Sequence, residues 1–184
     1  NADKIAPSTG TTLTLGDVGD TITTAGTVSG FGKILQVLQT VVTATDSTTA
    51  VTGSFVDMAG MTVAITPSAV TSKVLVLWTA NISSGNSVRM NIRLMRDSAT
   101  PFLGAVTGSR IRTSTSDVGG NQDGLTPSSA QFLDSPSTTS ATTYKLQWCL
   151  STASTLYLNR SYGDSDTTAY NSTASTITVM EIGA

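Results

Sequence analysis

Residues Lys73–Leu94, KVLVLWTANISSGNSVRMNIRL, decide the fold class of this chain. Lys73–Trp78 is apolar at successive positions, which is typical of a central strand with both faces covered. Ser83–Ser87 supplies the Ser, Gly and Asn residues that favour a turn. Val88–Leu94 then alternates apolar with polar residues, which indicates a strand with one buried face. The stretch therefore predicts a β-hairpin. The positions predicted to face the core in its second strand are Val88, Met90, Ile92 and Leu94.

The rest of the chain from Phe31 onward continues this pattern. Further strands are predicted at Lys33–Val42, Gly53–Met58, Met61–Thr66, Phe102–Val106, Ser109–Arg112, Gln131–Leu133, Tyr144–Leu150, Thr155–Asn159 and Ser175–Ile182. Tyr144–Leu150 and Thr155–Asn159 are expected to form a second hairpin, and long polar loops are expected at Thr113–Pro127 and Arg160–Ser172. Many short strands at this spacing predict an antiparallel β-sandwich, jelly-roll-like in its connections.

The composition supports an all-β protein. Ser and Thr account for 58 of the 184 residues, charged residues make up 12%, and Glu181 is the single glutamate. Thr and Val suit a pleated surface, whereas helices are usually rich in Glu, Lys, Ala and Leu. The net charge of −2 argues against binding to nucleic acid or to an anionic membrane surface. No apolar stretch approaches the roughly 18 residues of a membrane span, so no membrane insertion is predicted.

The residue types that are missing restrict the chemistry. The chain has no histidine, which excludes a Ser-His-Asp triad, a Cys-His pair and any zinc site with histidine ligands. Cys149 is the single cysteine, so no disulfide can form within the chain, and its apolar neighbours predict a buried structural thiol. Only Asp remains as a general acid or base, and the spacing of the aspartates brings no pair together. We therefore expect a protein that is not an enzyme.

The first thirty residues differ from the rest of the chain. Their large apolar residues are Ile5, Leu13, Leu15, Val18, Ile22 and Val28. These six side chains cannot offset the loss of backbone entropy, which is roughly 1–2 kcal/mol for each ordered residue. The segment is therefore either a disordered arm or an extended β stalk that packs against other copies of itself, and the alternation of Leu with Thr favours the stalk. The predicted organisation is a stalk over residues 1–30 and a β-sandwich knob over residues 31–184.

Several motifs in this order resemble a known family. They are Leu13–Thr23, Gly32–Val37, Ser54–Asp57, Val63–Ser68, Thr71–Val76, Asn91–Asp97 and Ile177–Ile182. Together they resemble the C-terminal knob of tail-fibre-like structural proteins of bacteriophages, especially phages of aquatic and cyanobacterial hosts, with Leu13–Thr23 similar to the preceding shaft repeat. The resemblance extends over most of the chain and consists of packing motifs, so it assigns no binding residue.

The resemblance implies a homotrimeric fibre of the virion, assembled in the host cytoplasm, whose distal domain attaches to the host surface. The implied partners are the sister chains, other virion proteins through the N-terminal segment, and a glycan or protein of the host cell surface. A capsid head fibre or decoration protein is the alternative, and a carbohydrate-binding module detached from an enzyme is a third. The stalk pattern favours either viral assignment over the third.

The loops are the expected site of receptor contact, because rigid β-scaffolds usually present their binding residues there. In the loop that ends at Ser172, aromatic rings can pack on sugar C–H groups while amides and carboxylates bind hydroxyls. The predicted receptor- or glycan-binding residues are Arg160, Tyr162, Asp164, Asp166, Tyr170 and Asn171.

Two other groups of residues resemble parts of binding sites. Arg89 and Arg93 share one strand face, with Arg110 and Arg112 near them in sequence, and form an alternative anion-binding face. Asp164-Ser165-Asp166 resembles the start of a calcium loop, but Ala169 and Ser175 stand where that loop needs Gly and Glu. Neither a metal site nor a cofactor is predicted.

Overall fold

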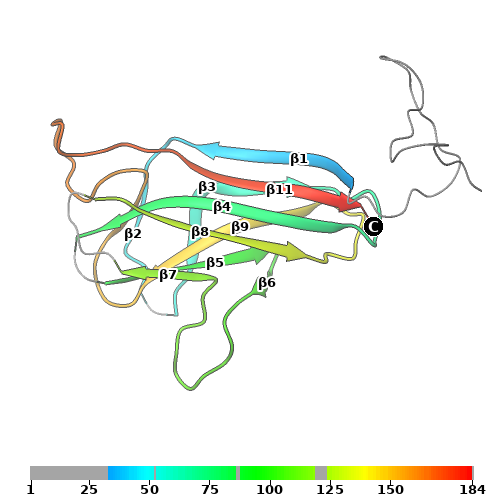
Figure 1. The fold of residues 1–184 in the computed structure, drawn as a ribbon. Coiled ribbons are helices and arrows are strands. Elements are labelled where there is room, and N and C mark those ends of the chain that lie inside the picture. The colour runs from blue at the N-terminus through cyan, green and yellow to red at the C-terminus, as the bar shows by residue number, and fades with distance from the viewer. Residues whose placement is uncertain (1–32, 52, 86–87, 119–123, 184) are drawn as a thin grey trace, which may run out of the picture. The chain divides into compact units, whose positions relative to one another are not determined.

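The computed structural model describes residues 33–51, 53–85, 88–118 and 124–183, and these form eleven strands (Figure 1). The strands are β1 (Lys33–Val42), β2 (Asp46–Thr48), β3 (Val56–Ile65), β4 (Lys73–Ser84), β5 (Arg89–Arg96), β6 (Ala99–Phe102), β7 (Thr115–Val118), β8 (Thr126–Asp134), β9 (Thr142–Leu150), β10 (Leu156–Leu158) and β11 (Ser175–Gly183). These residues contain no helix, and so none that could span a membrane. The predicted stalk, residues 1–30, lies outside the described residues.

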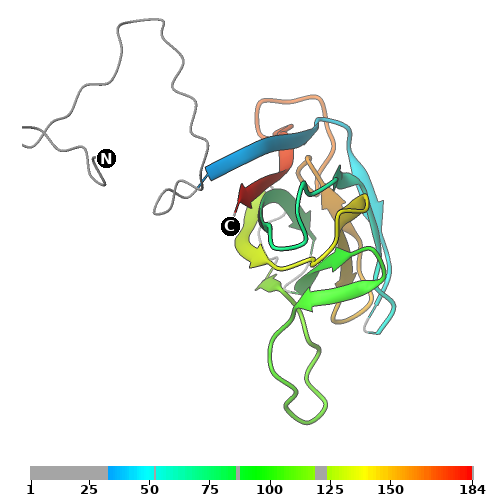
Figure 2. The ribbon, with the colours of Figure 1, turned by 90° about the vertical axis from the view of Figure 1, so that its right-hand side faces the viewer.

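The strands form two antiparallel sheets. In the first, β11 and β10 pair with one side of β4, β8 pairs with its other side, and β1 and β2 lie beyond β11 and β10. In the second, β9 lies between β3 and β5, and β6 and β7 pair with the far edge of β5. Figure 2 shows the two layers nearly end-on. The fold is therefore an antiparallel β-sandwich, as the sequence predicts.

The core lies between the two sheets and follows the period of two expected for strands. The four residues predicted to face inward from 88 to 94 are all buried, as are Met61, Val63 and Ile65 of β3. The largest fully buried side chains include Trp148, Tyr144, Leu146 and Leu150 of β9. The sequence thus predicts correctly the inward-facing residues between 88 and 94.

Both predicted hairpins are wrong. β4 belongs to the first sheet and β5 to the second, so these two strands are not paired with each other. β9 and β10 likewise belong to different sheets. The alternation of a strand identifies its buried face, and two strands that face each other across a core alternate just as two neighbours in one sheet do. The pattern therefore cannot distinguish these arrangements.

The segment between β6 and β8 also differs from the prediction. Ser109–Arg112 was expected to be a strand, but the chain from 103 to 114 is a loop. Thr113–Pro127 was expected to be a loop, yet β7 occupies part of it and pairs with β5, while 119–123 lie outside the described residues. Ser114 helps to fix this segment, since its backbone N–H donates to the Ile92 carbonyl and its hydroxyl to that of Phe102.

The two ends of the sandwich carry different segments of the chain. Lys33 lies opposite Gly183 at one end, and Val42 lies opposite Ser175 at the other. Residues 1–32 join at the Lys33 end, whereas the loop that precedes Ser175 lies at the far end of β11 (Figure 1). Nine strand residues span about 30 Å at about 3.4 Å each. The loop and the start of β1 are therefore separated by nearly the length of the sheet.

Glu181 anchors the Lys33 end. This residue is fully buried, and its carboxylate accepts hydrogen bonds of 2.7 Å from Gln36 Nε2 and from both the backbone N–H and the hydroxyl of Ser68. Burial alone would raise the pKa of the carboxyl, but these hydrogen bonds outweigh it and bring the pKa from 4.5 to about 2. An ionised carboxylate thus connects β1, β11 and the segment after β3.

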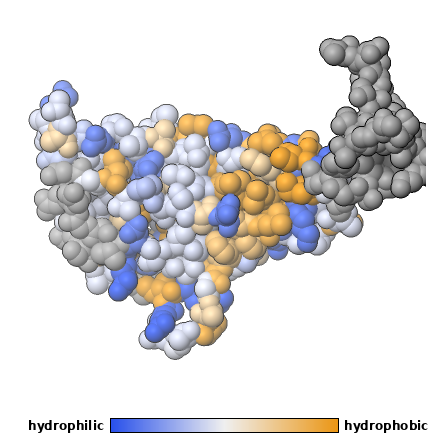
Figure 3. Space-filling view, viewed as in Figure 1, coloured by the Kyte–Doolittle hydropathy of each residue, from blue (hydrophilic) through white to orange (hydrophobic). Residues whose placement is uncertain are grey.

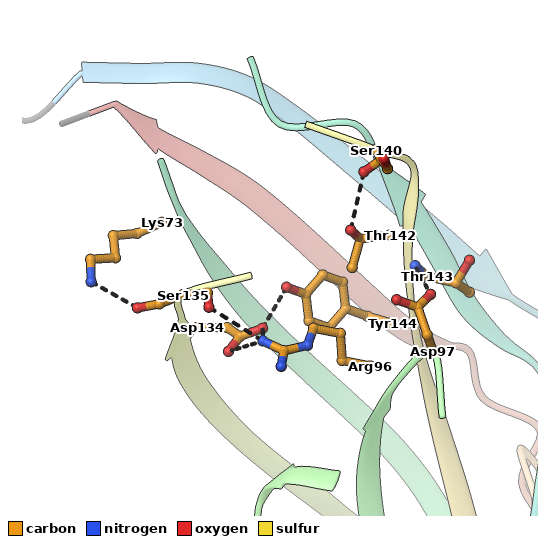
Figure 4. A network of polar contacts seen from close by, with 9 residues as sticks. All are labelled: Lys73, Arg96, Asp97, Asp134, Ser135, Ser140, Thr142, Thr143 and Tyr144. Atoms are coloured by element: carbon orange, nitrogen blue, oxygen red, sulfur yellow. Dashed lines mark hydrogen bonds and ion pairs between the residues drawn. The ribbon is translucent and has the colours of Figure 1, made fainter. Parts of the chain in front are cut away.

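A second buried carboxylate joins the two sheets near the same end (Figure 4). Asp134, the last residue of β8, accepts hydrogen bonds from Arg96 Nη1 at 2.9 and 2.8 Å and from the Tyr144 hydroxyl at 2.7 Å. The neighbouring Ser135 carbonyl also accepts from Arg96, and its hydroxyl accepts from Lys73. Burial and the hydrogen bond to the Asp134 carboxylate raise the pKa of Tyr144. Arg96 and Tyr144 belong to the second sheet, so this network connects the layers.

Candidate functional site

The loop between β10 and β11 encloses a polar cavity of about 350 Å³. Its two arms are held by the isolated bridge between Arg160 and Ser172, by hydrogen bonds in both directions between Ser161 and Asn171, and by the Thr173 N–H donating to the Asn159 carbonyl. The cavity is lined by Arg160, Ser161, Gly163, Asp164, Ser165, Asp166, Thr167, Tyr170, Asn171 and Ser172. Five of the six residues predicted to bind a receptor therefore surround one cavity.

Arg160 organises the first arm of this loop. Its guanidinium lies 3.8 Å from the centre of the Tyr157 ring and forms an ion pair with Asp164, with Nη1 and Oδ2 3.2 Å apart. The same Nη1 donates to the carbonyls of Ser161 and Tyr162. The Asp164 side chain is 74% exposed, so the ion pair is solvated and contributes little to stability. Its main effect is to orient a cation and an anion at the cavity wall.

Tyr170 and Asn171 form the opposite wall. The Tyr170 ring packs so closely over Gly163 that a Cβ atom at Gly163 would overlap it. The backbone N–H of Tyr170 donates to the Thr167 carbonyl, which closes a turn before the ring. Asn171 is exposed and its side chain has no hydrogen bond among the described contacts. A half-buried ring beside an available amide suits the recognition of a sugar.

Tyr162 lies on another side of the loop. Its ring contacts Tyr157 edge to face, with centroids 5.7 Å apart, and covers Gly85 so closely that a Cβ atom there would overlap it. It does not line the cavity. The geometry thus separates the two tyrosines: Tyr170 lines the cavity, and Tyr162 attaches the loop to the end of β4.

Asp166 also lines the cavity and is exposed. Among the described residues, no group of three or more acidic or cysteine side chains is arranged to hold a metal ion. Both loop carboxylates, Asp164 and Asp166, are exposed at the surface.

The two arginines of the alternative anion-binding face, Arg89 and Arg93, have different surroundings. The Arg93 guanidinium donates to Gln147 Oε1 at 2.8 and 2.6 Å and lies 4.2 Å from the centre of the Phe55 ring. Arg89 instead lines a separate cavity of about 530 Å³ together with Arg110. The remaining lining residues are Asn91, Ile111, Thr113 and Ser116. The structure therefore places Arg89 and Arg110 at the wall of one cavity, a grouping that strand alternation does not predict.

Cys149 is buried, as predicted. It lies opposite Asn91 in the pairing of β9 with β5, and the Asn91 amide is 3.9 Å from its Sγ atom. Burial raises the pKa of the thiol, which lowers its reactivity.

A comparison with models of protein families gave no match, and a comparison with curated proteins gave no significant one. The resemblance to phage fibres therefore rests on the sequence motifs, and any function rests on the chemistry of the loop.

Proposed function

We propose that this chain is the distal part of a homotrimeric bacteriophage tail fibre, a structural protein of the virion that attaches to a glycan on the host surface without catalysis. The observation that carries this proposal is that the loop cavity and the first described residue, Lys33, lie at opposite ends of the sandwich. The polar cavity of the 160–172 loop lies at the end of the sandwich opposite Lys33, where the remaining chain joins. A fibre attached to the virion through residues 1–30 would present this loop outward.

The chemistry of the cavity favours a glycan as the receptor. Tyr170 offers an aromatic surface, Asn171 an amide, and Arg160 with Asp164 a paired donor and acceptor, all around one cavity. Sugars are bound by this combination of ring stacking and hydrogen bonds to hydroxyls. Binding is shared among several weak, solvated contacts, so a fibre benefits from having three copies of the loop.

The same residues favour binding without turnover. A carboxylic acid that donates a proton near neutral pH has to be buried or placed beside a like charge. Asp164 is largely exposed and paired with Arg160, and Asp166 is exposed. Incubation of the protein with a bound polysaccharide should therefore release no reducing ends, and release that depends on either aspartate would contradict the proposal.

A glycan array followed by affinity measurement tests the proposal. The full chain should bind at least one class of surface glycan. The double variant Tyr170→Ala/Asn171→Ala should lose on the order of 1–3 kcal/mol, or roughly 5- to 150-fold in affinity. The control is Thr139→Ala, an exposed change in the turn between β8 and β9. Labelled antibodies against the protein should locate it on the tails of whole virions rather than on the heads.

The competing site provides the result that would refute this assignment. If the Tyr170→Ala/Asn171→Ala variant binds as well as the parent, while Arg89→Ala/Arg110→Ala abolishes binding, recognition occurs in the arginine-lined cavity. Ionic strength distinguishes the two directly, because binding through two guanidinium groups to an acidic glycan weakens with added salt and ring stacking does not.

A further inference from the structure

The outer face of the first sheet carries an apolar surface that the described residues leave uncovered. Four residues stand in direct register across β1, β11, β4 and β8: Val37, Met180, Leu75 and Leu133. Beside them, Ile34 lies opposite Ile182. We call these six residues the apolar row. The outermost members are the most exposed, with Ile34 at 57%, Val37 at 52% and Leu133 at 54%.

The apolar row occupies one end of the sheet only. Towards the opposite end, the next residues on the same face are mostly polar: Gln39, Thr178 and Gln131, and then Thr176, Thr79 and Ser129. Figure 3, drawn from the same side as Figure 1, shows the apolar side chains gathered over one part of the sheet. They lie at the end that carries Lys33 and Gly183. A contiguous apolar surface of this kind on a sheet of otherwise polar outer residues marks a contact surface.

We propose that a second copy of this chain covers the apolar row, so that the outer faces of the first sheets pack against one another in the assembled protein. This inference rests on the proposed function, because in a fibre the copies are joined through residues 1–30. In the sequence, residue 30 comes three positions before Lys33, the first residue of β1, and Ile34 follows Lys33. The ends of the domains that carry the apolar row are therefore the ends that such a fibre holds together.

The chemistry of the row fits a copy of itself. It contains no charged side chain. Lys73 lies directly opposite Ile182 at the extreme end of the sheet; it is exposed, and its ammonium donates a hydrogen bond to the Ser135 hydroxyl. Two such rows can meet without burying a charge, which would otherwise oppose association. A hollow of about 420 Å³ beside the row, between Leu77, Gln131 and Thr178, offers a depression into which a partner's side chain can fit.

The test is the oligomeric state of the full chain, measured by light scattering and sedimentation. The variant is Val37→Lys/Leu133→Lys. Each side chain is about half exposed in a single chain, so a lysine there can extend into solvent and the domain should fold. In the assembly both lysines would be buried in apolar contacts. We expect the dissociation constant to rise at least 100-fold. The control, Val106→Lys, places a lysine at a residue that is 75% exposed on the 103–114 loop and should leave assembly unchanged.

The outcomes separate this inference from the proposed function. A double variant that assembles as well as the parent overturns the inference. A parent chain that is monomeric at micromolar concentration overturns it as well, even if it binds glycan. If the parent is monomeric and the apolar row is nevertheless protected from surface labelling, the residues that cover the row are 1–32 of the same chain. If the variant dissociates while no glycan is bound by any form, the interface stands and the receptor function fails.

Discussion

Two of the ion pairs among the described residues allow a test of how burial determines the contribution of an ion pair to stability. Asp134 and Arg96 approach to 2.8 Å, with their side chains 5% and 26% exposed. Asp57 and Lys145 approach to 2.7 Å, with side chains 55% and 30% exposed. The distances are nearly equal, so a difference between the variants Asp134→Asn and Asp57→Asn measures the environment rather than the geometry.

The expected magnitudes follow from these exposures. Removal of one member of a buried ion pair costs about 3–5 kcal/mol, because the other charge remains without its partner. Arg96 keeps a quarter of its side chain in solvent and can be partly rehydrated, which places Asp134→Asn at the lower end, about 3 kcal/mol. The amide can still accept the Tyr144 hydrogen bond. Asp57→Asn should cost less than about 1 kcal/mol, since exposed pairs rarely contribute more.

Denaturant unfolding followed by tryptophan fluorescence measures both changes, since Trp78 and Trp148 are buried. Protein concentration must be held constant, because unfolding coupled to dissociation depends on it. For a domain of this size, about 3 kcal/mol also lowers the melting temperature by roughly 6–12 °C. Added salt should reduce the effect of Asp57→Asn and leave that of Asp134→Asn nearly unchanged. Equal effects of the two variants, or a loss below about 1 kcal/mol for Asp134→Asn, would refute this reasoning.

Three further predictions concern single residues. The pKa of Glu181 is lowered from 4.5 to about 2, so its contribution to the free energy of unfolding is complete above about pH 4.5 and is lost as the pH falls towards 2. In the variant Glu181→Gln, the free energy of unfolding should therefore change less with pH between 4.5 and 2 than in the parent. Gly163→Ala should displace Tyr170 and weaken glycan binding about tenfold, whereas Gly104→Ala, which has room for a Cβ atom, should not. Cys149 should react with a thiol reagent at the rate of unfolding, and a fast reaction of the native protein would show that its burial is incomplete.

The fold class could be predicted from the sequence because strand alternation is a local property. Met90 and Ile92 face the core because successive side chains of a strand point to opposite faces, whatever the strand pairs with. The partner of a strand is set by residues far away in the chain, and both predicted hairpins failed for this reason. β4 pairs with β11, about a hundred residues further along the chain, and neither sequence contains a local sign of the other.

The candidate site, too, could be predicted from the sequence only in part. The composition of the loop predicted Arg160, Asp164 and Tyr170 as a group, and they do surround one cavity. It could not distinguish Tyr170 from Tyr162, because the direction of each ring depends on where a glycine leaves space for it. Gly163 lies in the same loop, but Gly85 belongs to the turn after β4 and comes close to Tyr162 only in the folded chain.

The apolar positions of Lys73–Trp78 predicted a central strand covered on both faces, and the knob satisfies only half of that prediction. Val74, Val76 and Trp78 are buried in the core, whereas Leu75 and Leu77 on the outer face are only partly buried. A surface strand that met water on this face would be expected to carry polar residues there, as β8 does at Ser129 and Gln131. The same sequence pattern that correctly places β4 at the centre of its sheet thus indicates a second contact for its outer face. A single chain does not supply that contact within the described residues, and a neighbouring copy would.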